Sequence, residues 1–197
     1  MIATFRKILV FAAVVSLLCS GFVLYTHQVM QRTTQPHIHS NLSQLPAADL
    51  GFLYIDEADT QDLSNLSNKC RILLQQGYLQ ELYIAYNAKG EASARKINTE
   101  LQEENLQVYT LHSATTLIEA VYNVCLEQHN CTMTMIGHPR SVEQALFVAL
   151  QLNQSVSGYV MPHLANQSHT VTDMLTEVRV YFKVQQLTDD TAALVSR

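Results

Sequence analysis

The chain opens with a long apolar run that precedes a region of alternating apolar and amphipathic segments. From Ile8 to Tyr25 the sequence reads ILVFAAVVSLLCSGFVLY and contains no charged residue. A helix rises about 1.5 Å per residue, so about 20 apolar residues cross the hydrocarbon core of a bilayer. With the residues that follow, the run is just long enough, and it predicts a transmembrane anchor at residues 8–29.

The charges beside this run predict its orientation. Arg6 and Lys7 precede it, and no further basic residue occurs before Arg32. The positive-inside tendency therefore places residues 1–7 in the cytoplasm and the rest of the chain outside. A cleaved signal peptide is the alternative, because its basic and apolar regions look the same. No small-x-small cleavage site follows the run, which favours an uncleaved anchor.

Beyond the anchor, the pattern predicts a linker, one domain and a short tail. Residues 30–48 are polar and include Leu45-Pro46, which is typical of a linker. Apolar runs then alternate with helical periodicity over residues 49–188, and residues 189–197 form the tail. The predicted strands are 50–55, 81–86, 107–111, 131–136 and 156–161. The predicted helices are 62–76, 91–105, 115–128, 142–152 and 170–187.

This alternation predicts an α/β fold with a parallel five-stranded sheet covered by helices on both faces. Gly77 is expected to end the first helix of the domain. Ser113 is a plausible N-cap of the third helix. In the second helix, the residues expected to face the core are Ala92, Ile97 and Leu101.

Charge and cysteine content narrow the function classes. The chain has a net charge of -5, and after Arg6 and Lys7 it carries 10 basic and 17 acidic residues. Without a basic cluster, we expect no nucleic-acid partner. Cys125 and Cys131 are close enough in sequence for a disulfide in an oxidising compartment, and buried thiols are the alternative. No Cys/His spacing typical of a metal site occurs, so we expect neither metal nor cofactor.

Candidate site residues follow from the predicted topology. Ligands of parallel sheets bind beyond the carboxyl ends of the strands. The segments that follow the predicted strands, residues 56–60, 87–91, 112–116 and 137–141, therefore hold the candidate pocket. Its residues are Asp56, Glu57, Asn87, Glu91, Thr116, His138, Arg140 and Ser141.

One segment carries a family resemblance. From Met135 to Leu150 the chain reads MIGHPRSVEQALFVAL, which is similar to the strand, loop and "ERALFIA" helix of SanA/YdcF-like (ElyC/SanA/YdcF) bacterial envelope proteins. The segments 45–51 and 173–186 resemble the family's lead into its first strand and its closing helix. The resemblance covers roughly residues 1–187. It implies a Rossmann-like three-layer domain and, for the SanA branch, an inner-membrane helix and a role in the envelope permeability barrier.

The departures from the family pattern bear on activity. Asp56 and Glu57 stand where the family has a glycine loop, and two carboxylates would repel a phosphate. The family's histidine and arginine around the "ERALF" motif fall on Ser141 and Gln144. The retained positions are Glu91, Thr116 and Glu143, and the resemblance adds Glu143 to the candidate pocket. The resemblance therefore implies binding rather than robust catalysis.

Three functions remain open from the sequence. The first is a SanA-like inner-membrane protein whose periplasmic domain supports the envelope barrier by binding a cell-wall or lipid-linked precursor or a protein partner. The second is an enzyme acting on a phosphate-containing or nucleotide-sugar-like envelope precursor, with His138 as acid/base and Arg140 as anion clamp. The third is a scaffold that associates through its anchor near Gly21.

Overall fold

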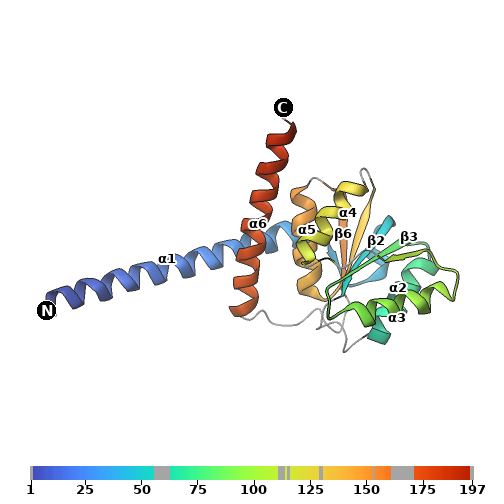
Figure 1. Cartoon of the computed structure of the whole chain (residues 1–197), viewed down its shortest axis with the longest axis horizontal. Helices are drawn as coiled ribbons and strands as arrows, with labels where there is room; N and C mark the ends of the chain where they lie inside the picture. The colour runs from blue at the N-terminus through green and yellow to red at the C-terminus, as the bar shows by residue number, and fades with distance from the viewer. Residues whose placement is uncertain are drawn as a thin grey trace.

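The chain forms one long N-terminal helix and an α/β domain (Figure 1). The computed structural model describes residues 2–55, 63–110, 114, 116–128, 131–152, 154–160 and 171–195. Helix α1 (Ile2–Thr34) projects from the domain, and only its C-terminal part lies against it (Figure 1). The coarse prediction of an α/β fold behind one apolar helix is therefore confirmed.

Within the described residues, the sheet contains six parallel strands in the order β1-β6-β5-β2-β3-β4. Their bounds are β1 Ile38–His39, β2 Ala48–Ile55, β3 Leu79–Tyr86, β4 Val108–Thr110, β5 Met133–Gly137 and β6 Val156–Val160. In the central register, Leu50 of β2 is level with Glu81 of β3 and Met133 of β5. The strand order reverses beside β2, because the chain adds β3 and β4 on one side and then returns to add β5 and β6 on the other.

Helices cover both faces of the sheet. Helices α2 (Leu63–Gln75) and α3 (Glu91–Gln102) pack on one face, and α4 (Leu117–Glu127) and α5 (Pro139–Gln151) pack on the other (Figure 1). Helix α6 (Val171–Val195) and the end of α1 lie outside α5. The two core clusters on the two faces follow from the buried strands, whose side chains alternate between the faces.

The segment expected to be a linker is instead part of the fold. Helix α1 continues to Thr34, and a 3-10 turn at Gln35–His37 leads directly into β1. Ile38 is level with Gly158 of β6, so this two-residue strand extends the sheet from five strands to six. A second 3-10 turn at Leu42–Gln44 connects it to β2. The expected linker at residues 30–48 and the five-strand count were therefore wrong, because pairing with β6 orders a segment that has no strand pattern of its own.

Several helix details also differ from prediction. Thr116, and not Ser113, caps α4, since its side chain accepts a hydrogen bond from the Glu119 amide. Ser113 itself lies outside the described residues. In α3, Ile97 and Leu101 are buried as predicted, whereas Ala92 is exposed and Ala94 is buried in its place. Helix α5 begins three residues earlier than predicted, because Pro139 suits the first helical turn.

Gly77 ends α2 as predicted. Its φ of 74° is left-handed, a conformation that glycine adopts without the steric cost of a side chain. The amides of Gly77 and Tyr78 donate to the carbonyls of Leu74 and Leu73, which satisfies the last turn of the helix.

Helix α1 has two parts with opposite environments. Apolar side chains from Val10 to Tyr25 are mostly exposed, and Leu17 and Leu18 are exposed by about 70%. In contrast, Thr26, Met30 and Thr34 are fully buried at four-residue spacing, so one stripe of the last turns packs into the domain. Among the described residues, this is one helix long and apolar enough to cross a membrane.

Candidate functional site

Asn87, which follows β3, forms a local turn. Its Oδ1 accepts hydrogen bonds from the backbone amides of Lys89 and Gly90, at 3.0 and 2.9 Å. The backbone amide of Asn87 donates to the carbonyl of Ile55. Gly90 packs so closely on the end of β2 that an added Cβ would lie 2.3 Å from the Ile55 oxygen. This turn closes over the strand ends, so Asn87 has a structural role in the described chain.

Glu91 and Thr116 also serve the ends of their helices. Glu91 accepts two hydrogen bonds from the Arg95 guanidinium one turn later; the Arg95 side chain is exposed and that of Glu91 is half-buried. Thr116 is the N-cap of α4. An acid in the first turn and a hydroxyl at the N-cap both stabilise a helix without any ligand.

The loop after β5 places three candidates at the start of α5. His138 is the N-cap residue, and its side chain does not cap the helix by a hydrogen bond. Arg140 and Ser141 follow in the first turn, and all three side chains are half-buried. The other two acidic candidates, Asp56 and Glu57, lie outside the described residues.

Glu143 differs from these candidates because it is buried, with an exposed fraction of 7%. It lies one turn into α5, on the side that α1 and α6 cover. Burial raises the pKa of the Glu143 carboxyl to about 7, and the charge of Glu177 adds to the rise. His27 and a hydrogen bond with Thr34 act in the opposite direction. Glu143 therefore lies in a polar cluster, here called the junction cluster: His27, Thr34, Glu143 and Glu177.

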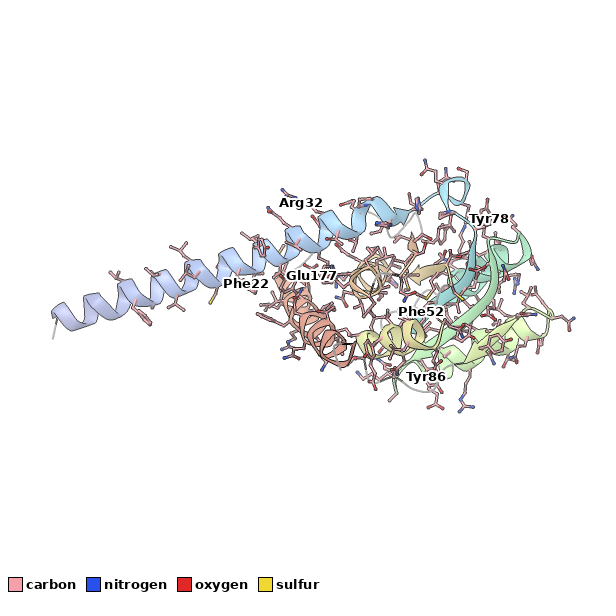
Figure 2. All side chains as sticks on the ribbon, turned by 90° about the horizontal axis from the view of Figure 1, so that it is seen from above. Phe22, Arg32, Phe52, Tyr78, Tyr86 and Glu177 are labelled. Carbon is pink, nitrogen blue, oxygen red and sulfur yellow. The ribbon has the colours of Figure 1, made fainter. Side chains whose placement is uncertain are left out.

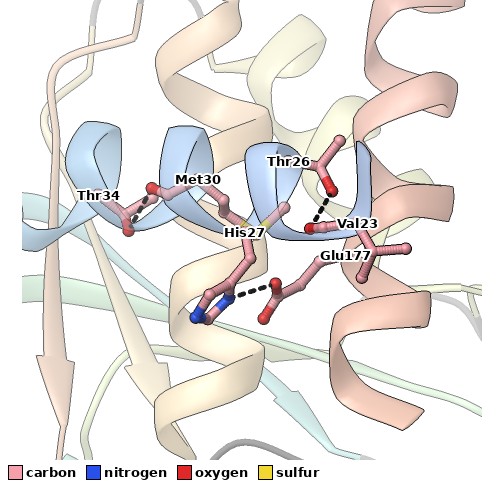
Figure 3. Close-up of polar contacts among 6 residues, drawn as sticks. All are labelled: Val23, Thr26, His27, Met30, Thr34 and Glu177. Atoms are coloured by element: carbon pink, nitrogen blue, oxygen red, sulfur yellow. Dashed lines mark hydrogen bonds and ion pairs between the residues drawn. The ribbon is translucent and has the colours of Figure 1, made fainter. Parts of the chain in front are cut away.

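The junction cluster joins three helices that are distant in sequence. Nδ1 of His27 in α1 lies 2.7 Å from Oε2 of Glu177 in α6, and Glu177 is only 2% exposed (Figure 3). Thr34 donates to the Met30 carbonyl one turn back, at 2.9 Å (Figure 3). Because a buried polar group is costly unless it is hydrogen-bonded, the contact between His27 and Glu177 helps to fix where α6 crosses α1.

A cavity of about 260 Å³ opens beside the junction cluster. It lies at the carboxyl end of β6, between the end of α1 and the start of α5. Its lining is Gln31, Thr34, Gln35, Ile38, Ser40, Pro139, Glu143 and Val160. The donors and acceptors are amides, hydroxyls and one carboxylate, and no lysine or arginine occurs among these lining residues.

The chemistry of this cavity suits hydroxyl groups better than a phosphate. Side-chain amides can donate to hydroxyls and accept from them, and a carboxylate can accept from them, whereas a phosphate requires positive charge or clustered backbone amides. Within the described part of the chain, no three histidine, cysteine or acidic side chains are arranged to hold a metal ion.

The cysteines give no redox centre in the structure. All four are free thiols, and Cys70 and Cys125 are buried. Burial raises the pKa of each of these two thiols to about 12, so both remain protonated and unreactive near neutral pH. Cys131 is half-buried, and its Sγ lies 4.0 Å from Oε1 of Gln128.

The sequence therefore located one residue of this site, Glu143, and missed its partners. His27 and Thr34 lie at the end of an apolar helix that was expected to be in the bilayer or in a linker. A usable signal was present, because Thr26, Met30 and Thr34 repeat every four residues across the point where the run turns polar. Comparisons with family models, with curated proteins and with solved structures found no match to this chain.

Proposed function

We propose that this chain is a membrane-anchored cell-envelope protein of the SanA-like kind, with a Rossmann-like domain that acts by binding rather than by robust catalysis. The observation that carries the proposal is that α1 has two parts: an apolar part whose side chains are exposed, and a C-terminal part with a buried stripe that packs into the domain. A core helix of a soluble domain buries its apolar side chains, whereas this one leaves them exposed up to the point where it meets the domain.

The buried end of α1 also supports an anchor that is retained. Met30 is completely buried, and His27 pairs with Glu177. Cleavage after the apolar run would create a new chain end within a turn of these contacts, which a signal peptide is not expected to make. We place the protein in the inner membrane with residues 1–7 in the cytoplasm and the domain in the periplasm, because Arg6 and Lys7 precede the span.

For the ligand, we propose the hydroxyl-rich sugar portion of a cell-wall or lipid-linked precursor, bound in the cavity beside Glu143. Gln31, Gln35 and Ser40 provide neutral donors and acceptors there. The cavity adjoins the end of the anchor, so a ligand attached to lipid would reach it from the membrane surface.

The anchor is tested by measuring the intact mass of the chain purified from bacterial membranes. We expect the full mass and resistance to alkaline extraction. A mass that lacks the apolar run, or release of the whole chain by alkali, would contradict the proposal.

The ligand is tested by thermal unfolding of the full chain in detergent, with the soluble sugar portion of a lipid-linked cell-wall precursor and, separately, with undecaprenyl phosphate. At a hundredfold excess over Kd, a ligand of the native state raises Tm by about 5 °C or more. We expect this rise with the sugar, its loss in Gln35→Ala, and its retention in Gln44→Ala, an exposed glutamine away from the cavity. A shift with the phosphate alone, or turnover of the precursor that His138→Ala abolishes, would favour the enzyme instead.

A further inference from the structure

Helix α6 presents an exposed face that is apolar and basic. Leu175, Arg179, Phe182 and Gln186 are exposed at a spacing of three or four residues, which makes them one stripe. The opposite stripe of Glu177, Val180 and Val184 is buried against α1 and α5. Leu175 and Phe182 remain more than half exposed.

A contact between Phe182 and α1 shows where the exposed stripe of α6 lies relative to the apolar run. Its ring stacks on that of Phe22, with 5.5 Å between the centroids. Phe22 belongs to the apolar run, four residues before the first buried residue of α1, Thr26. Four residues are about 6 Å of helix, so the ring of Phe182 lies level with the end of the run that we assign to the bilayer.

The direction of α6 agrees with this position. In Figure 1 it crosses α1 and does not run along it, and in Figure 2 it lies to one side of α1; in both views it lies between the projecting part of α1 and the layers of the domain. A membrane crossed by α1 would therefore meet α6 before any other element of the domain.

Among the described side chains of α6, the exposed charges are basic. Over the described side chains 174–188, the exposed charged residues are Arg179 and Lys183, both basic, in a chain whose net charge is -5. Both flank Phe182. An aromatic ring between basic side chains suits the boundary between acyl chains and anionic headgroups.

We propose that α6 lies on the surface of the bilayer that α1 crosses, with Phe182 inserted at the acyl-headgroup boundary and Arg179 and Lys183 on anionic headgroups. This inference rests on the proposed anchor. Helix α6 gives the domain a second membrane contact, which holds the cavity beside Glu143 near the lipid surface.

The chain contains no tryptophan, so each introduced tryptophan is a single fluorescent probe. Three full-length variants, Phe182→Trp, Leu17→Trp and Tyr109→Trp, are reconstituted separately in vesicles of phosphatidylethanolamine and phosphatidylglycerol. Tyr109 is an exposed aromatic on β4, at the far edge of the sheet. Quenching is measured with lipids brominated near the carbonyl end or near the methyl end of the acyl chains.

We expect Phe182→Trp to emit at shorter wavelength than Tyr109→Trp and to be quenched more by the shallow bromines than by the deep ones. Leu17→Trp should be quenched by the deep bromines, and Tyr109→Trp by neither. An unquenched Phe182→Trp beside a quenched Leu17→Trp would overturn the surface contact and leave the anchor intact. If Leu17→Trp is also unquenched, the anchor itself fails.

A second variant tests the charges. In the Phe182→Trp chain, Arg179→Glu with Lys183→Glu should reduce the shallow quenching in phosphatidylglycerol vesicles. The same change should have little effect in vesicles of phosphatidylcholine alone. Equal quenching with and without the two basic residues in phosphatidylglycerol vesicles would refute the headgroup contact.

Discussion

The Glu143 carboxyl has a raised pKa because of contacts that no local sequence pattern predicts. Its carboxyl has an ordinary pKa of 4.5, which rises to about 7 in the folded chain because of burial and the nearby Glu177. The folded state therefore holds a proton that the unfolded state releases between these two values. It follows that the stability contributed by Glu143 is fully present below pH 4.5 and is lost as the pH rises to about 7.

Glu143→Gln should remove this pH dependence. The variant keeps the shape of the side chain but cannot ionise, so its stability relative to the natural chain should increase between pH 4.5 and 7.5, by up to about 3 kcal/mol. Urea unfolding in detergent across this range measures the difference. Parallel stability curves for the two chains would show that Glu143 is not desolvated in the way described.

Gly90 is a second residue whose identity follows from packing. Gly90→Ala would place a methyl group against the Ile55 carbonyl, and backbone cannot move aside as a flexible side chain does. We expect a loss of about 2 kcal/mol or more in the free energy of unfolding. Gly77→Ala is the matched control, because space is open there and only the left-handed backbone costs about 1 kcal/mol. Equal losses in the two variants would contradict the close approach at Gly90.

At the scale of elements, the helices and strands that could be predicted from the sequence are those with a strong repeat of apolar residues. The five longer strands and the helices between them have their own apolar periodicity, and each was located to within a few residues. Strand β1 could not be predicted, because Ile38–His39 is too short to alternate and is ordered only by pairing with β6. The junction cluster was missed for a related reason, since His27 and Glu177 are 150 residues apart in sequence.

The two parts of α1 should respond differently to the same substitution. Met30→Ala removes a fully buried side chain, and we expect it to lower the free energy of unfolding by about 3 kcal/mol. Leu24→Ala, at a position that is 54% exposed in the same helix, should change domain stability by less than about 0.5 kcal/mol. Thermal unfolding of both variants in detergent provides the comparison. Similar losses would mean that the boundary between span and domain lies elsewhere.

At the scale of the whole molecule, the domain does not begin where the apolar run ends. A fragment of residues 40–197 lacks β1, Met30 and Thr34, and it exposes the core surface that they cover. We expect a fragment of residues 26–197 to unfold cooperatively at a clearly higher temperature than the shorter one. Circular dichroism of both fragments measures this, and equal midpoints would show that the end of α1 adds nothing to the fold.

The unbroken helix between span and domain has a geometric consequence. Each residue of an α-helix turns its direction by about 100° and raises it by about 1.5 Å. The rotational position of the domain about the anchor is therefore set by the helical phase between the apolar run, which ends at Tyr25, and the buried stripe that begins at Thr26. A single residue inserted between Phe22 and Thr26 would rotate the cavity by about 100° around the anchor and turn Phe22 away from Phe182. The continuous helix therefore fixes the rotational position of the domain around the anchor, whereas a flexible tether would leave that position free.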